Sequence, residues 1–113
     1  MIIRDYNPKD ELAWLRCRLM AFLDCSYFDD VKRKKDVYEN PSINLVAEKD
    51  SQIVGFIDIE YQPEKSATIW DLGVLPEYRC LSIATKLFNE AKARLLKLGV
   101  KRIEVWTQDD IEA

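Results

Sequence analysis

The chain has 113 residues, of which 48% are apolar and 33% are charged, and it contains no histidine. This length and composition predict one globular domain over residues 1–113, long enough to bury a core. The formal net charge of −3 argues against broad binding to nucleic acid or to an anionic membrane, because both need a basic field. The lack of histidine excludes Ser-His-Asp triads, Cys-His nucleophile pairs and histidine metal sites.

The cysteine pattern and the hydropathy indicate the cellular compartment in which the protein is expected. Three cysteines without a Cys-x-x-Cys spacing indicate neither a disulfide framework nor a cysteine zinc site. No window approaches the roughly 20 consecutive apolar residues of a membrane span, and the N-terminal residues lack the features of a signal peptide. We therefore expect a cytoplasmic protein without a metal site, in which Cys17 and Cys25 are small core side chains.

The first part of the chain predicts a strand followed by helices. Residues 2–6 read as a short strand, and a helix is expected over 8–24 with Asn7 as its N-cap and Pro8 in its first turn. The buried stripe of this helix is expected to consist of Leu12, Leu15, Leu19, Phe22 and Leu23.

A second, more polar helix is expected around residues 29–38. Its basic run is interpreted as a solvated face, because blocks of like charge seldom lie in a core. The run consists of Lys32, Arg33, Lys34 and Lys35.

Three strands with short turns follow, over residues 43–48, 52–61 and 66–75. Such brief links predict an antiparallel meander. A helix over 83–98 comes next, and Gly99 is positioned to end it. Its inward face is expected to consist of Ala84, Leu87, Phe88, Ala91, Leu95 and Leu98.

The last expected strand covers residues 100–107. Because it follows a helical crossover, it should run parallel to the strand before the helix. The order is then β-α-α-β-β-β-α-β, which defines an α/β fold with a mixed sheet covered by helices.

The junction between the strand over 66–75 and the following helix is predicted to bind an anion. Free N–H groups at a helix N-terminus, together with the helix dipole, favour phosphate. Arg79 adds a permanent positive charge that can form two parallel hydrogen bonds to phosphate oxygens. A phosphate-bearing cofactor is the natural ligand of such a junction.

This element order, and the residues at the junction, resemble the GNAT superfamily of acyl-CoA-dependent N-acetyltransferases. The lead-in to the helix reads Val74-Leu75-Pro76-Glu77-Tyr78-Arg79. The family motif Arg/Gln-x-x-Gly-x-Gly/Ala falls on Arg79-Cys80-Leu81-Ser82-Ile83-Ala84. Ser82 replaces a glycine of the family, and its hydroxyl is expected to donate to a phosphate oxygen or to cap the helix, with weaker CoA binding as the cost.

The resemblance implies acetyl-CoA as the acyl donor, held by backbone groups at two places. Leu72, Gly73 and Val74 are expected to pair with the pantetheine arm like an added strand, and the Val74 amide is the expected oxyanion donor. Gly73 fits a bulge or a close approach there. The pyrophosphate is expected on the amides of Arg79, Cys80, Leu81, Ser82, Ile83, Ala84 and Thr85.

Transfer in this family is a direct attack of a neutral amine on the thioester, so a carboxylate can serve as the base. Asp71 is the candidate, either as that base or as a ligand of the substrate ammonium, and a purely structural pairing is the equal alternative. Glu60 and Tyr61 are candidates for the acceptor pocket. The thiol of Cys80, beside Arg79, is either a reactive group with a lowered pKa or a bystander.

The resulting hypothesis is an N-acetyltransferase that transfers acetyl from acetyl-CoA to a primary amine. Members of the family usually continue with another helix and two strands, which this sequence lacks. A non-catalytic acyl-CoA-binding or interaction module is therefore the alternative. The uncovered edge of the strand 101–107 predicts pairing with a second copy, as a homodimer or a larger assembly.

Overall fold

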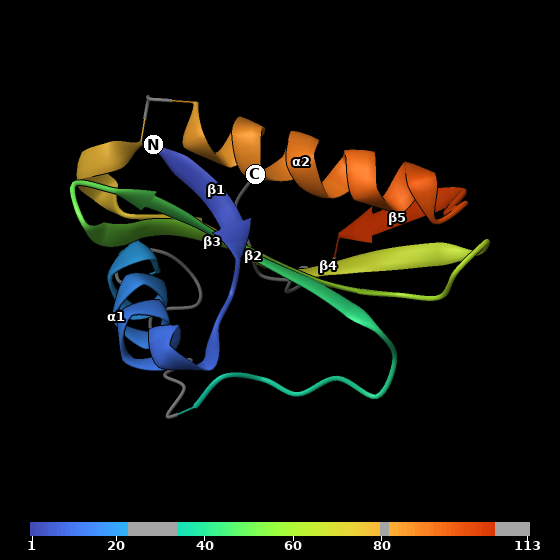
Figure 1. The fold of residues 1–113 in the computed structure, drawn as a ribbon, viewed down its shortest axis with the longest axis horizontal. Coiled ribbons are helices and arrows are strands. Elements are labelled where there is room, and N and C mark those ends of the chain that lie inside the picture. The colour runs from blue at the N-terminus through green and yellow to red at the C-terminus, as the bar shows by residue number, and fades with distance from the viewer. Residues whose placement is uncertain (23–33, 80–81, 106–113) are drawn as a thin grey trace.

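Five strands form one mixed sheet, and they lie in it in the order in which the chain meets them (Figure 1). The computed structural model describes residues 1–22, 34–79 and 82–105. Neighbouring strands are antiparallel except the last two, which are parallel. The predicted meander and the predicted parallel crossover are both confirmed. The strands are β1 (Ile2–Asp5), β2 (Ser42–Lys49), β3 (Gln52–Tyr61), β4 (Ser66–Val74) and β5 (Arg102–Val105).

The two α-helices cover opposite faces of this sheet (Figure 1). On one face, the ring of Phe56 in β3 lies 5.4 Å from that of Trp14 in α1 (Glu11–Ala21). On the other face, a Cβ added to Gly55 would come within 3.1 to 3.2 Å of side-chain atoms of Ile83 and Leu87 in α2 (Ile83–Lys97). Adjacent residues of β3 thus contact different helices, as the alternation of a strand requires.

Short 3₁₀ turns lead out of β1 and β4, at η1 (Pro8–Asp10) and η2 (Pro76–Tyr78). The predicted cap at Asn7 is confirmed. Its Oδ1 accepts the Lys9 N–H at 3.0 Å, and the Asp10 carboxylate accepts the Asn7 N–H at 2.8 Å. This reciprocal arrangement satisfies donors that the start of a helix leaves open.

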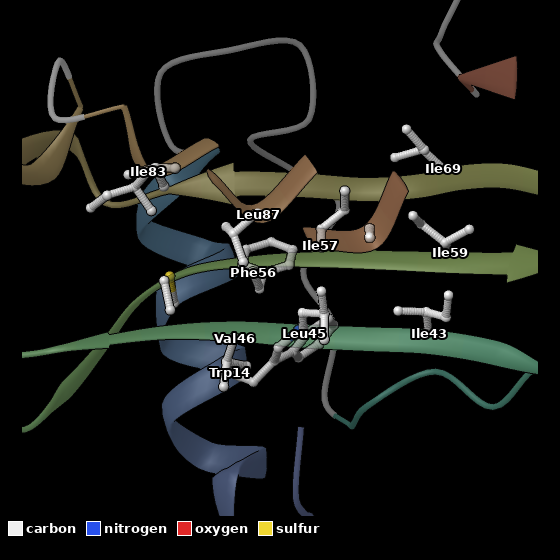
Figure 2. Packing of buried hydrophobic residues seen from close by; sticks show 14 of the residues in the cluster. Trp14, Ile43, Leu45, Val46, Phe56, Ile57, Ile59, Ile69, Ile83 and Leu87 are labelled. Carbon is white, nitrogen blue, oxygen red and sulfur yellow. The ribbon is translucent and has the colours of Figure 1, made fainter. Parts of the chain in front are cut away.

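The buried cluster is built from apolar side chains of β2, β3 and β4 between the two helices (Figure 2). The predicted inward face of α2 is confirmed, because Leu87, Ala91 and Leu95 are buried. Gly99 has φ +76 and follows the last turn of α2, as expected for a residue that ends a helix. Cys17 is fully buried, in agreement with its predicted place in the core.

The predicted stripe of α1 is wrong in part. Leu15 and Phe22 are partly buried against the core, and Leu23 lies outside the described residues. Leu12 is 82% exposed and Leu19 is 39% exposed. The helix instead buries a face that includes a charged side chain, and apolar periodicity therefore overlooked it. That face consists of Trp14, Cys17, Arg18 and Ala21.

The segment after α1 also differs from the prediction. Residues 34–38 contain no helix, and residues 29–33 of the expected second helix lie outside the described ones. Lys34 is exposed, but Lys35 is only 9% exposed, so the basic run is not a uniform solvated face. Within the described residues, no helix is long and apolar enough to cross a membrane.

Candidate functional site

Within the part of the chain that the structure describes, the edge of β4 that faces β5 has no strand partner over half its length. β5 pairs with β4 from Ser66 to Ile69 only. A bulge begins at this point: Asp58 pairs with Asp71 but Ile59 pairs with Ile69, which leaves one extra residue in β4. Among the described residues, the stretch 70–74 of β4 therefore has a strand partner on the β3 side alone.

Backbone groups of Val74 point to this open edge. The N–H of the next residue, Leu75, donates to the Val54 carbonyl of β3 at 2.8 Å. Successive N–H groups of a strand point to opposite edges, so the Val74 N–H is directed away from β3, and by the same alternation so is that of Leu72. The stretch expected to pair with pantetheine thus presents two donors to an extended ligand.

Gly73 has a structural reason to be glycine. A Cβ at this position would lie 2.8 Å from Cε1 of Phe56 and 3.2 Å from Cβ of Ala21. The missing side chain therefore lets β4 pass close to the aromatic core under α1. The predicted close approach is present, and its partners belong to the protein itself.

The N-terminus of α2 presents free donors in a second place. The first i to i−4 bond of the helix runs from the Lys86 N–H to the Ser82 carbonyl at 3.0 Å. The N–H groups of Ile83, Ala84 and Thr85 precede it and have no acceptor within the helix. No acidic residue lies in the first turn, so nothing there opposes an anion.

Ser82 adopts the left-handed conformation, with φ 61 and ψ 22. Glycine enters this region without a steric penalty, whereas a residue with a Cβ does not. The left-handed backbone at position 82 therefore explains why the family motif has glycine at this position. The serine hydroxyl makes no capping hydrogen bond to α2, so the capping role expected of it is wrong.

Val74 and the first turn of α2 border one pocket of about 340 Å³. It brings together most of the residues predicted for the cofactor. Leu72 and Gly73 do not line it, and Cys80 and Leu81 lie outside the described residues. The lining residues are Val74, Tyr78, Arg79, Ser82, Ile83, Ala84 and Thr85.

The guanidinium of Arg79 borders this pocket and also ties two elements together. Its Nη2 donates to the Ala21 carbonyl at 2.5 Å, and its Nε donates to the Val74 carbonyl at 3.3 Å. Ala21 is the last residue of α1, where carbonyl groups lack partners within the helix. Arg79 thus joins the end of α1 to the end of β4 and brings a positive charge to the pocket.

Asp71 faces a cation on the α1 side of the sheet. Its Oδ1 lies 3.5 Å from Nη2 of Arg18, and the two side chains are 11% and 4% exposed. Arg18 in turn lies over the ring of Phe22, 5.1 Å from the centroid. The structure therefore holds the predicted base in a nearly buried ion pair, inside the open stretch of β4 and directly before Leu72.

Glu60 and Tyr61 line a separate small pocket of about 120 Å³, with Asn40, Gln62, Ser66 and Thr68. The Glu60 carboxylate accepts three hydrogen bonds, two from Asn40 and one from the Trp70 indole. The bond from the Asn40 backbone is the main cause of a lowered pKa at Glu60. Such a carboxylate stays ionised and anchors its neighbours, which makes it a poor proton acceptor.

Sequence reasoning missed Asp58, whose carboxylate is the most deeply buried one among the described residues. It is fully buried in β3 opposite Asp71, and its Oδ1 lies 3.2 Å from Nζ of Lys35. Burial raises its pKa to about 7 although Lys35 opposes the shift. One acidic residue inside the apolar run of β3 was the signal that could have drawn attention to it. A carboxyl group with such a pKa can gain or lose a proton at neutral pH.

No cluster of three or more potential metal ligands occurs within residues 1–22, 34–79 and 82–105. The groups described above are backbone donors, carboxylates and buried cations. Donors at a helix N-terminus beside an open strand edge are suited to an elongated, phosphate-bearing ligand.

The chain belongs to the acetyltransferase (GNAT) family, whose model matches residues 4–113. It is 29% identical over 117 residues to an acetyltransferase of Pectobacterium atrosepticum, covering 100% of this chain and 80% of that protein. It is 31% identical over 100 residues to an acetyltransferase of Sodalis glossinidius, covering 88% of this chain and 68% of that protein.

Solved structures agree on the fold. The PaiA N-acetyltransferase of Thermoplasma acidophilum, determined in complex with coenzyme A, superposes with a TM-score of 0.79 at 17% identity. The match covers 98% of this chain and 81% of that one. The predicted family and the predicted fold class are confirmed, and the protein is a probable acetyltransferase.

Proposed function

We propose that this protein transfers the acetyl group of acetyl-CoA directly to a primary amine. The observation that carries the proposal is the pocket in which donors from Val74 and from the first turn of α2 converge. A pyrophosphate fits the helix end, and the pantetheine arm extends from there along the open edge of β4. Binding of coenzyme A by a structural neighbour of the same fold supports this choice of donor.

In this proposal the thioester carbonyl lies beside the Val74 N–H, which stabilises the oxyanion that forms during attack. Asp71 lies three residues earlier on β4 and supplies negative charge where a cationic acceptor approaches. Arg18 positions its carboxylate from α1 at 3.5 Å. The acceptor therefore approaches from the α1 side of the sheet, and Asp58 lies on that same side.

A thiol-release assay tests the proposal. The protein is incubated with acetyl-CoA and a panel of primary amines, and free CoA thiol is followed with a chromogenic disulfide. Amine-dependent release of thiol is expected, with the acetylated amine found by mass spectrometry. Binding of acetyl-CoA without amine-dependent release would instead identify a non-catalytic acyl-CoA-binding module.

We propose in addition that two copies associate through β5. Val105 at its end is 64% exposed, and within the described residues one edge of this strand has no partner. Such an edge favours pairing with another chain. Light scattering coupled to size exclusion at micromolar concentration should give a dimer or larger species, and a monomer would contradict this.

A further inference from the structure

The ammonium group of Lys35 lies inside a cluster of aromatic rings. Its Nζ is 4.8 Å from the ring centroid of Trp14, 5.3 Å from that of Tyr6 and 5.5 Å from that of Tyr38. Aromatic faces attract cations at these distances, and the attraction grows when the cation is desolvated. Lys35 as a whole is 9% exposed, so its charge is largely removed from solvent.

Two polar side chains complete the surroundings of this ammonium. Nζ donates to Oδ1 of Asn44 at 2.8 Å and lies 3.2 Å from Oδ1 of Asp58. We call the five residues around it the ammonium cage, which consists of Tyr6, Trp14, Tyr38, Asn44 and Asp58. Three rings, one amide oxygen and one carboxylate are together suited to a primary alkylammonium ion.

Three of the five cage residues come from regular structure. Trp14, Asn44 and Asp58 belong to α1, β2 and β3, whereas Tyr38 shares with Lys35 the stretch 34–38, which has neither helix nor strand. The backbone N–H of Lys35 is held by Oε2 of Glu11 at 3.0 Å. The helix and strand side of the cage thus receives a side chain carried by an irregular segment, which also brings the ring of Tyr38.

Stability alone is a weak reason for this arrangement. A buried ion pair loses hydration on both sides, and replacing such a pair with apolar side chains is often neutral or stabilising. Both oxygens of Asp58 lack a well-aligned hydrogen-bond donor among the described residues, so the desolvation of this carboxylate is poorly compensated. A polar site that costs stability points to recognition.

The cage lies next to the proposed acyl-transfer edge. Asp58 pairs with Asp71 across β3 and β4, and Asp71 directly precedes the stretch proposed to bind pantetheine. Adjacent strands are about 4.8 Å apart, so the cage is one strand removed from that edge. Both carboxylates face a cation on the α1 side of the sheet, from which the acceptor approaches.

We propose that the ammonium cage binds a cationic group of the acceptor amine, and that Lys35 occupies it in the free protein as an internal competitor. This inference rests on the proposed function. It assigns the acceptor to the alkylammonium class and makes the Lys35 segment a regulator of acceptor affinity. The apparent affinity of an acceptor that displaces Lys35 is its intrinsic affinity multiplied by the fraction of free protein molecules in which the cage is empty.

The first test uses the unaltered protein and does not depend on turnover. Lysine is labelled with ¹³C at Cε, and the Lys35 signal is expected to be shifted by the three rings relative to that of exposed Lys34. Titration with n-butylammonium chloride, which reproduces the lysine side chain, should move the Lys35 signal towards the position of an exposed lysine. The neutral isostere n-butanol should leave it unchanged. A Lys35 signal that stays ring-shifted up to saturating n-butylammonium would overturn the proposal.

The second test uses kinetics. Lys35→Met removes the internal ammonium with little change in side-chain length, and Lys34→Met is the matched control at an exposed neighbour. Lys35→Met should lower the KM for the amine about tenfold, as expected if the cage is empty in about a tenth of wild-type molecules, and leave the KM for acetyl-CoA unchanged. An unchanged amine KM in a folded Lys35→Met protein would contradict the inference.

The two tests separate this inference from the proposed function. If no amine is acetylated at all, the proposed function fails, while the ¹³C titration still decides whether the cage exchanges its occupant. If Lys35→Met does not fold, the titration of the unaltered protein decides alone.

Discussion

Asp58 and Asp71 are direct partners across β3 and β4, and each carboxylate faces a buried or nearly buried cation, Lys35 for Asp58 and Arg18 for Asp71. Two ion pairs therefore lie side by side between the sheet and the α1 layer. This arrangement combines the groups that a cationic acceptor needs with the edge at which acetyl-CoA is proposed to bind. The predictions below test its parts separately.

Removing the Arg18 cation should destabilise the protein. Arg18→Met leaves the Asp71 carboxylate nearly buried without this partner, and breaking a buried pair on one side costs about 3 kcal/mol in the free energy of unfolding. Urea denaturation measures the change. Arg16→Met, on the exposed side of the same helix, is the control and should change stability by less than about 0.5 kcal/mol.

The double variant Arg18→Met/Asp71→Asn should recover much of that loss, because it removes the charge left behind. Equal stability of the single and the double variant would show that the Arg18–Asp71 pair is not the cause.

The pH dependence of stability should reveal the buried carboxyl of Asp58. Its pKa in the folded state, about 7, lies above the ordinary value of 3.8, so the folded protein holds this proton more tightly than the unfolded chain. The contribution of Asp58 to stability should therefore fall as the pH rises from about 4 to about 7, and then stay constant.

Urea denaturation of the wild type and of Asp58→Asn over this pH range isolates the effect. The wild type should lose stability relative to the variant with increasing pH. A difference that is constant, or that changes in the opposite sense, would argue against a raised pKa at Asp58.

Gly73→Ala should destabilise the protein by overpacking. The added Cβ would lie 2.8 Å from Phe56, and such crowding in a filled core costs about 1 to 3 kcal/mol. Thermal and urea denaturation measure the loss. In a Phe56→Leu background the same substitution should cost clearly less, and an equal cost in both backgrounds would mean that Phe56 is not the obstacle.

Ser82→Gly should stabilise the protein by about 1 kcal/mol, because it relieves a left-handed conformation that a Cβ disfavours. Ser82→Ala keeps the Cβ and removes the hydroxyl, so it separates backbone strain from hydrogen bonding. If the hydroxyl contributes to phosphate binding, Ser82→Ala should weaken acetyl-CoA binding in calorimetry. Ser82→Gly should not lower the free energy of unfolding. Destabilisation by Ser82→Gly would contradict the backbone account.

Much of the fold follows from local patterns in the sequence. The strands of the meander and the inward face of α2 have clear periodicity, and Gly99 ends α2 where the left-handed conformation requires it. The geometry of the strand-to-helix junction, at which an anion site is proposed, was predictable for the same reason, since the open N–H groups of a helix start and Arg79 are local features.

The ion pairs were not predictable in this way. Arg18 occupies a buried position of α1, so apolar periodicity assigned the wrong face to that helix. Lys35 is buried because rings from separate parts of the chain surround it, which no local pattern of charge reveals. The basic run was therefore predicted to be a solvated face, although one of its members, Lys35, is buried.

Calorimetric titration with acetyl-CoA tests the central claim most directly, when Thr85→Glu and Asn89→Glu are compared with the wild type. Both residues are exposed on α2 and gain the same charge, but only Thr85 lines the proposed pyrophosphate pocket. An acid in the first turn favours the helix, so Thr85→Glu should not lower the unfolding temperature. Its affinity for acetyl-CoA should fall more than about tenfold, the cost of one like-charge contact of about 1.4 kcal/mol, and Asn89→Glu should bind like the wild type. Wild-type protein that fails to bind acetyl-CoA, or Thr85→Glu that binds it equally well, would contradict the account.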